Sequence, residues 1–239
     1  MAQSGLLNIV AIGAHIHDAE VMAGAVLANY TRNGHSATII HVTPGEKGHP
    51  GVSPEVYEKT KRQEAAESAE VLGAEVVFLP YKDAELPLTN RTINSLASLL
   101  RQMQPDCVLT HWRGSFHPDH FKTHCLAVEA VRKSMDFSFD DGQEVCGNYP
   151  VLFCENWEDK TGFVPDILVD ISDSYEIWLN AMMKHGLFRG EVSPFNYRAY
   201  YEGLIVERGA LAKTGRAVAL MRSPFSSTAG DLPAVMKGV

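Results

Sequence analysis

The chain has 239 residues, of which 45% are hydrophobic and 21% charged, a balance typical of a globular protein. Its formal net charge is −8 and it contains no basic run, which argues against nucleic acid and anionic membranes as partners. No apolar stretch is long enough to span a bilayer, and the N-terminal segment lacks the basic start and cleavage site of a signal peptide. We therefore expect a cytoplasmic protein.

Apolar segments that suit strands alternate with segments that suit helices over the first 185 residues. Strands are predicted at 7–13, 36–42, 75–79, 106–110, 150–155 and 167–171, and helices at 19–30, 55–72, 92–103, 120–133 and 174–185. The first run, LNIVAIG, is almost continuously apolar, as in parallel strands that are covered on both faces. The alternation predicts an α/β fold, a Rossmann-like and mostly parallel sheet with helices on both faces. The segment after about residue 194 is less regular, and we expect it to pack on the same domain, so that residues 1–239 form a single domain.

Three polar segments directly follow predicted strands. They are AHIHDAE at 14–20, TPGEKGH at 43–49 and HWRGSFHPDH at 111–120. Because ligands of open α/β sheets bind outside the carboxyl ends of the strands, we expect these segments to converge. The first turn is not a dinucleotide-binding turn, since His15 and Asp18 stand where the glycine fingerprint starting at Gly13 requires glycines.

Two of these segments favour a metal site. His15 and Asp18 are three residues apart at a strand-to-helix turn, so both side chains can face one point, and imidazole and carboxylate groups are common zinc ligands. His117 and His120 have the same spacing, so one can complete the site while the other faces the substrate, and Asp119 can orient a neighbouring histidine. Alone, each motif is more often a helix cap or a turn. Together, after two strands, they favour a catalytic site with three protein ligands and an open position for water.

The motifs resemble those of the LmbE/PIG-L family of zinc-dependent N-deacetylases. The first motif of that family is A-H-P-D-D-x-E, and the second is H-P-D-H, which is intact at 117–120. Further likenesses are KRQE from residue 61, YKDAEL from 81, VDISDSYEIWLNAMMKH from 169 and AYYEGL from 199, so the resemblance spans about residues 7–205. It implies an LmbE-like fold, removal of an acetyl or similar acyl group from an amino sugar, and, because relatives often form trimers or hexamers, a homo-oligomer.

The resemblance also implies a role for each motif residue. His15, Asp18 and His120 match the ligands of one zinc ion. His117 matches the histidine that supports the oxyanion, and Asp119 matches the carboxylate that orients it.

Two further positions match residues that contact the sugar in relatives. They are Arg62 and Asp83. Arg62 suits a solvated charge on a helix equally well, and Asp83 suits a turn residue equally well.

One position departs from the family pattern. His17 stands in place of the first Asp of the D-D pair, which acts as general base on the water. Three interpretations remain open: His17 is itself the base, His17 is an additional metal ligand, or the base is lost and the fold now serves binding. We therefore expect a zinc-dependent hydrolase of an N-acylated amino sugar or related metabolite. The alternatives are a catalytically impaired, metal-containing protein that binds such a metabolite, and a hydrolase of a non-acetyl amide or ester.

Overall fold

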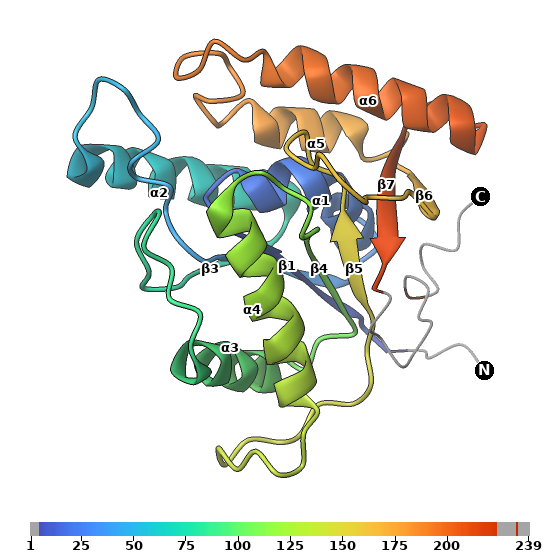
Figure 1. The fold of residues 1–239 in the computed structure, drawn as a ribbon. Helices are drawn as coiled ribbons and strands as arrows, with labels where there is room; N and C mark the ends of the chain where they lie inside the picture. The colour runs from blue at the N-terminus through green and yellow to red at the C-terminus, as the bar shows by residue number, and fades with distance from the viewer. Residues whose placement is uncertain (1–4, 224–232, 234–239) are drawn as a thin grey trace.

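The computed structural model describes residues 5–223 and residue 233, so both ends of the predicted single domain, 1–239, include residues outside the described range. Within that range, all seven strands belong to one sheet, in the order β3-β2-β1-β4-β5-β7-β6 (Figure 1). The strands are β1 (Asn8–Gly13), β2 (Ser36–His41), β3 (Glu75–Phe78), β4 (Cys107–His111), β5 (Val151–Cys154), β6 (Ile167–Asp170) and β7 (Ala217–Arg222). The first five run parallel, which confirms the predicted mostly parallel α/β sheet.

Helices cover both faces of the sheet, as predicted. The helices are α1 (Asp18–Thr31), α2 (Pro54–Leu72), α3 (Asn90–Met103), α4 (Pro118–Ser134), α5 (Tyr175–Met182) and α6 (Tyr197–Ala212). In Figure 1, α1, α2, α5 and α6 lie on one side of the strands, and α3 and α4 lie on the other. None of the described helices combines the length and the apolar character that a bilayer crossing requires.

The first strand shows why its sequence is continuously apolar. Ile9 and Ala11 are fully buried in the core beneath α1 and α5, whereas Val10 and Ile12 are fully buried in the core beneath α3 and α4. Successive side chains of a strand point to opposite faces, so a strand covered on both sides needs apolar residues at every position.

The order of the strands reverses between β1 and β4. From β1 the chain first adds β2 and β3 on one side, and then returns to place β4 and β5 on the other. Crossovers in opposite directions leave a crevice at the carboxyl ends of the two central strands, where ligands of such sheets bind. The segments after β1 and β4 carry the two predicted motifs, so both border this crevice.

The segment after residue 194 is more regular than predicted. It forms the helix α6 and the strand β7, which pairs antiparallel with both β5 and β6. Gly203 and Gly209 interrupt the pattern of α6, and few of its side chains are buried, so the sequence lacks a clear apolar stripe.

Candidate metal centre

The connection from β1 to α1 is a tight turn. A Cβ on Gly13 would lie 2.8 Å from the backbone nitrogen of Ala19, so the close approach of these two segments requires glycine. His17 precedes the helix with a φ of 102°, a conformation that residues other than glycine rarely adopt. The turn places His15 and Asp18 side by side, with 3.1 Å between His15 Nδ1 and Asp18 Oδ2.

Three histidines converge on the Oδ2 atom of Asp18. This oxygen lies 3.1 Å from His15 Nδ1, 3.1 Å from His120 Nε2 and 3.5 Å from His111 Nε2. Burial acts to raise the pKa of Asp18, but His120 and His111 hold it well below its usual value, so the carboxylate is ionised. Asp18 begins α1, His111 ends β4 and His120 lies in the first turn of α4. The reversal of strand order therefore brings together the two predicted motifs.

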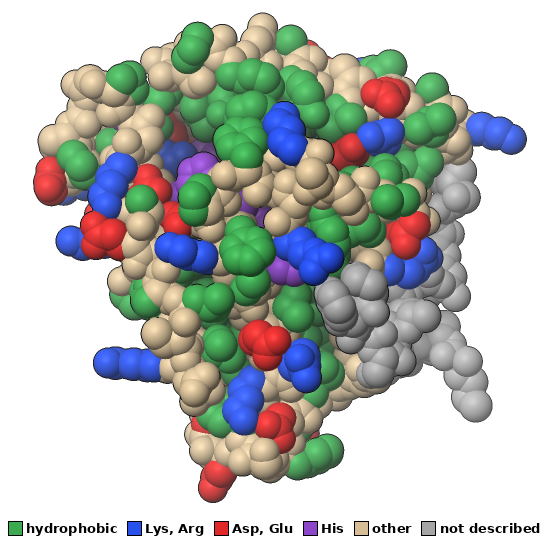
Figure 2. Space-filling model, in the orientation of Figure 1, with side chains coloured by type: hydrophobic (Ala, Val, Ile, Leu, Met, Phe, Trp, Pro, Cys, Tyr) green, Lys and Arg blue, Asp and Glu red, His purple; other side chains and the backbone are tan. Residues whose placement is uncertain are grey.

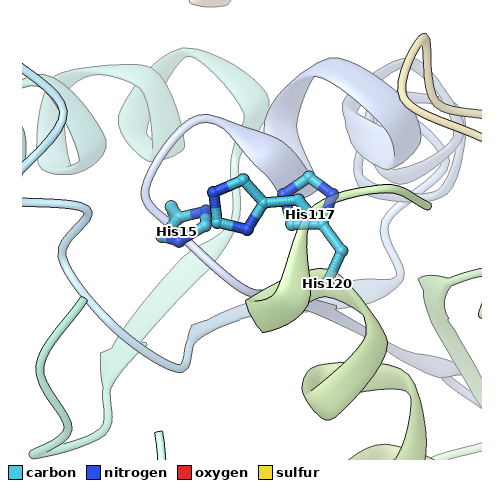
Figure 3. Close-up of side chains that lie close together, drawn as sticks. All are labelled: His15, His117 and His120. Carbon is cyan, nitrogen blue, oxygen red and sulfur yellow. The ribbon is translucent and has the colours of Figure 1, made fainter. Parts of the chain in front are cut away.

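His117 caps the helix that carries His120. Its Nδ1 accepts the backbone N–H of Asp119 at 3.2 Å, and Pro118 occupies the first turn, a common start for a helix. Its ring lies 4.8 Å from the rings of both His15 and His120 (Figure 3). Burial and these two neighbours lower the pKa of His117. The neutral ring, accepting at Nδ1, carries its proton on Nε2 and can donate it to a ligand.

Two residues that the sequence analysis did not identify hold the far side of His120. Glu158 Oε2 lies 3.0 Å from His120 Nδ1, and Ser115 Oγ lies 3.2 Å from the same atom. Burial acts to lower the pKa of His120, but Asp18 and Glu158 raise it to about 9. A carboxylate on the second nitrogen of a ligating histidine fixes the ring and strengthens its other nitrogen as a donor.

His111 is the other residue that the sequence analysis missed. It is fully buried at the end of β4, and its ring stacks on that of His120 at 4.1 Å. Its Nε2 accepts the backbone N–H of Ala14 at 3.0 Å. Burial and His120 lower its pKa to about 4, so the ring is neutral near pH 7. His111 thereby ties the end of β4 to the turn that carries the first motif.

The Nε2 atom of His15 faces two further carboxylates. Asp83 Oδ1 lies at 3.3 Å and Asp119 Oδ2 at 3.5 Å. Asp119 was predicted to orient His117 or His120, but its carboxylate instead lies against His15. The loop after β2 fixes Asp83, because the backbone N–H of Lys47 donates to Asp83 Oδ2 and Glu46 accepts the N–H of Asp83. The predicted loop thus borders the site through its contacts with Asp83.

The donors fit a divalent metal. Among the described residues, three sets of side chains have ligand atoms within 4.8 Å of one another: His15, His117 and His120; Asp18, His111 and His120; His15, Asp83 and Asp119. The predicted trio of His15, Asp18 and His120 is not one of these sets, although both of its histidines lie 3.1 Å from one oxygen of Asp18. The buried Nε2 atom of His15 forms no hydrogen bond, which fits a group of side chains that can bind a cation. Histidine side chains are visible in a recess of the face shown in Figure 2.

His17 lies outside these sets. Its ring is 2% exposed and contacts His185, Tyr197 and Phe188, with centroids 5.4, 5.5 and 6.3 Å away. Burial, His185 and Lys61 lower its pKa well below the usual value, so the ring stays neutral. The described contacts therefore give no support to His17 as an additional ligand.

The structure does not bring Arg62 to the cluster. Its guanidinium bonds Glu58 at 2.8 Å on the same helix and lies over the ring of Phe78. The preceding residue, Lys61, is the one that points inward, and its Nζ donates to the backbone carbonyl of Ile16 at 2.5 Å. Asp83, the other predicted sugar contact, lies at the cluster.

Comparison with known proteins defines the class of this chain. The family model described as PIG-L, GlcNAc-PI de-N-acetylase, matches residues 10–131, more than half of the chain. The chain belongs to this family, as the motifs predicted.

Individual relatives have two kinds of activity in their names. A 4-oxalmesaconate hydratase of Pseudomonas putida is 26% identical over 215 residues, covering 86% of this chain and 81% of that protein. A diacetylchitobiose deacetylase of Thermococcus kodakarensis is 27% identical over 190 residues, covering 74% and 68%. The crystal structure of GalB, the 4-carboxy-2-hydroxymuconate hydratase of Pseudomonas putida, superposes with a TM-score of 0.85 at 23% identity over 95% of this chain and 100% of that one. These relatives are enzymes, which supports the prediction that this chain is one.

Proposed function

We propose that this protein is a zinc-dependent hydrolase that removes an N-acyl group, most simply acetyl, from an amino sugar or a related metabolite. The observation that carries the proposal is the convergence of His15 and His120 on the ionised carboxylate of Asp18, at the crevice between β1 and β4. The similarity to a diacetylchitobiose deacetylase supports the choice of reaction. We also propose that the protein acts inside the cell, on a small molecule, and as a homo-oligomer.

His15, Asp18 and His120 would hold the zinc ion. When bound in such a site, zinc acidifies water and polarises a carbonyl group. Glu158 keeps His120 oriented through its Nδ1 atom. His117 presents the N–H of its Nε2 atom to the oxygen of the acyl group, where negative charge develops as water adds to the carbonyl carbon.

This chain differs from the family pattern in the residue at the position of the general base, which accepts the proton of the water. The His17 ring is unprotonated, as a general base must be, but burial and two neighbouring groups lower its pKa, which weakens it as a proton acceptor. The His17 ring also contacts His185 and Tyr197 rather than the histidines that converge on Asp18. We propose that His17 makes this a slow amide hydrolase.

The decisive test compares His17→Asp with the parent and with His17→Asn, which matches the variant in size without its charge. Zinc-loaded proteins are assayed for acetate release from N-acetylglucosamine and N,N′-diacetylchitobiose. We expect release by the parent and at least tenfold faster release by His17→Asp alone. Release by the variant but not by the parent would instead identify the parent as a binding protein or as an enzyme of another reaction. If neither the parent nor His17→Asp releases acetate, the proposed deacylase function is contradicted.

A second candidate function is hydration of a carbon–carbon double bond. It is favoured by the hydratase relative, whose similarity covers more of this chain than that of the deacetylase does. Hydration breaks the π bond of the alkene and one O–H bond of water, forms one C–O and one C–H bond, and releases no leaving group. Loss of the ultraviolet absorbance of 4-oxalmesaconate on adding the parent, with no acetate released from the amides, would establish this function in place of the first.

A further inference from the structure

An aromatic cluster lies beside the candidate metal centre. Its members come from separate segments of the chain: Phe116 before α4, Trp157 after β5, and Phe195, Tyr197 and Tyr200 around the start of α6. The ring of Phe116 lies edge-on to that of Trp157, with 5.5 Å between centroids, and Trp157 stacks on Phe195 at 4.3 Å. Phe195 in turn meets Tyr197 at 4.8 Å and Tyr200 at 5.7 Å. The rings thus form one continuous series of contacts.

Two of these aromatic residues are chain neighbours of residues at the centre. Phe116 directly precedes His117, and Trp157 directly precedes Glu158, whose carboxylate lies 3.0 Å from His120. In Figure 2, hydrophobic side chains border the recess in which histidines are visible. A ligand whose reacting group lies at the centre can therefore contact the aromatic cluster with another part.

Phe116 is held in place although much of it faces solvent. The residue is 55% exposed. Its backbone N–H donates to the carbonyl of Glu158 at 3.2 Å, and its neighbour Ser115 forms a β-bridge with Asp159, so the loop before α4 is bonded to the loop after β5. A fixed and exposed ring offers apolar surface to a ligand at a small cost in conformational freedom.

A lysine supplies polar donors at the edge of this surface. Lys160 Nζ lies 5.7 Å from the ring centroid of Phe116 and 5.3 Å from that of Trp157. It donates to the backbone carbonyl of Trp157 at 2.9 Å. An ammonium carries three N–H donors, so Lys160 can also donate to oxygens of a ligand.

We propose that Phe116 determines specificity by stacking on a ring of the substrate that lies beyond the acylated amine. The substrate class is then an N-acylated amino sugar that carries a second ring, either a sugar or an aryl group, since both present an apolar face. Contacts between such faces and an aromatic ring add to the gain from burial alone. A contiguous exposed apolar patch with a polar edge is typical of a binding surface. The inference rests on the proposed function in placing the acylated amine at the metal centre.

Binding without turnover tests the stacking. Three ligands are titrated into the full-length chain and followed by NMR, after chelation of metal and again after zinc loading. Methyl N-acetylglucosaminide has no second ring, benzyl N-acetylglucosaminide adds an aryl ring, and N,N′-diacetylchitobiose adds a sugar ring. The variants are Phe116→Ala, Phe116→Trp, which keeps an aromatic surface, and Phe137→Ala. The last removes a phenylalanine that is 90% exposed and lies beyond the other end of α4, a helix about 25 Å long.

We expect the parent to bind at least one of the two-ring ligands about fivefold more tightly than the methyl glycoside. Phe116→Ala should bind all three ligands with similar affinity, whereas Phe116→Trp and Phe137→Ala should keep the preference of the parent. The ring that gives the larger gain identifies the substrate group as sugar or aryl. Phe116→Ala should unfold at the temperature of the parent, because more than half of the residue is exposed.

Equal binding of the three ligands by the parent, no binding in either metal state, or a preference that Phe116→Ala retains would overturn the stacking. If Phe116→Ala retains the preference but forms a smaller oligomer, Phe116 belongs to a contact between two copies of the chain instead. A parent that shows the preference yet releases no acetate after zinc loading would contradict the proposed deacylase and leave the stacking result standing.

Discussion

The contact between Glu158 and His120 yields a quantitative prediction. Glu158 Oε2 lies 3.0 Å from His120 Nδ1, and the glutamate side chain is only 11% exposed. Substituting Glu158→Gln keeps an oxygen that can accept from the ring but removes the negative charge. Loss of such a carboxylate beside a metal-binding histidine costs about 10–100-fold in metal affinity. Because the amide keeps the hydrogen bond, we expect the lower end, about tenfold, which corresponds to about 1.4 kcal/mol.

The assay is a competition titration of zinc against a chromophoric chelator at neutral pH. Glu129→Gln is the control, since Glu129 is a half-exposed residue of the same helix as His120 and forms an ion pair with Arg132. The control should bind zinc as the parent does. Zinc affinity of Glu158→Gln within twofold of the parent, in a variant that unfolds at the parent's temperature, would refute the role of Glu158.

Three further predictions follow from the same geometry. Neighbouring carboxylates raise the pKa of His120 to about 9 against the effect of burial, so the metal-free protein gains stability from the bound proton below the unfolded-state pKa of about 6.5 and loses it as the pH rises towards 9. Thermal unfolding of chelated protein from pH 6 to 9 should show this decline, and His120→Asn should flatten it. Gly45 has a φ of 73°, and a Cβ there would lie 3.0 Å from the Cβ of His15, so Gly45→Ala should lower the free energy of unfolding by about 1–2 kcal/mol in urea titration. An unchanged midpoint would contradict this. The KM of Arg62→Ala for the substrate should lie within twofold of that of the parent, because the Arg62 side chain contacts Glu58 and Phe78 rather than the cluster. A tenfold higher KM would show that Arg62 does contact the substrate.

The regular helices and strands could be predicted from the sequence because the patterns that indicate them are local. LNIVAIG has apolar residues for both faces of a central strand, and Gly73 ends α2 in the left-handed conformation that suits glycine. The place of β7 was not readable. It comes last in the chain yet lies between β5 and β6, and such a pairing depends on contacts across the whole sheet rather than on its own six residues.

The site was readable only where its residues share a motif. The three-residue spacing within each of two pairs predicted the site: His15 with Asp18, and His117 with His120. Glu158 reaches His120 from the loop after β5, and no local pattern indicates that contact.

The position around the helix α2 decides which of two adjacent basic residues, Lys61 or Arg62, points inward. Lys61, Ala65, Ser68 and Leu72 are all buried on α2, and they follow the spacing of one helix face. Arg62 lies about 100° around the helix from that face. The apolar pattern of this segment therefore contained the signal that Lys61, and not its neighbour, points inward.

The central claim is that the residues after β1 and β4 form one metal site through Asp18. The most direct measurement is the zinc content of the purified full-length chain, after zinc addition and removal of loosely bound metal, compared with that of Asp18→Ala. We predict close to one zinc ion per chain in the parent and a loss of at least nine-tenths of it in the variant, with the variant still folded by circular dichroism. A parent that retains no divalent metal after zinc addition, or a variant that retains as much as the parent, would contradict the account.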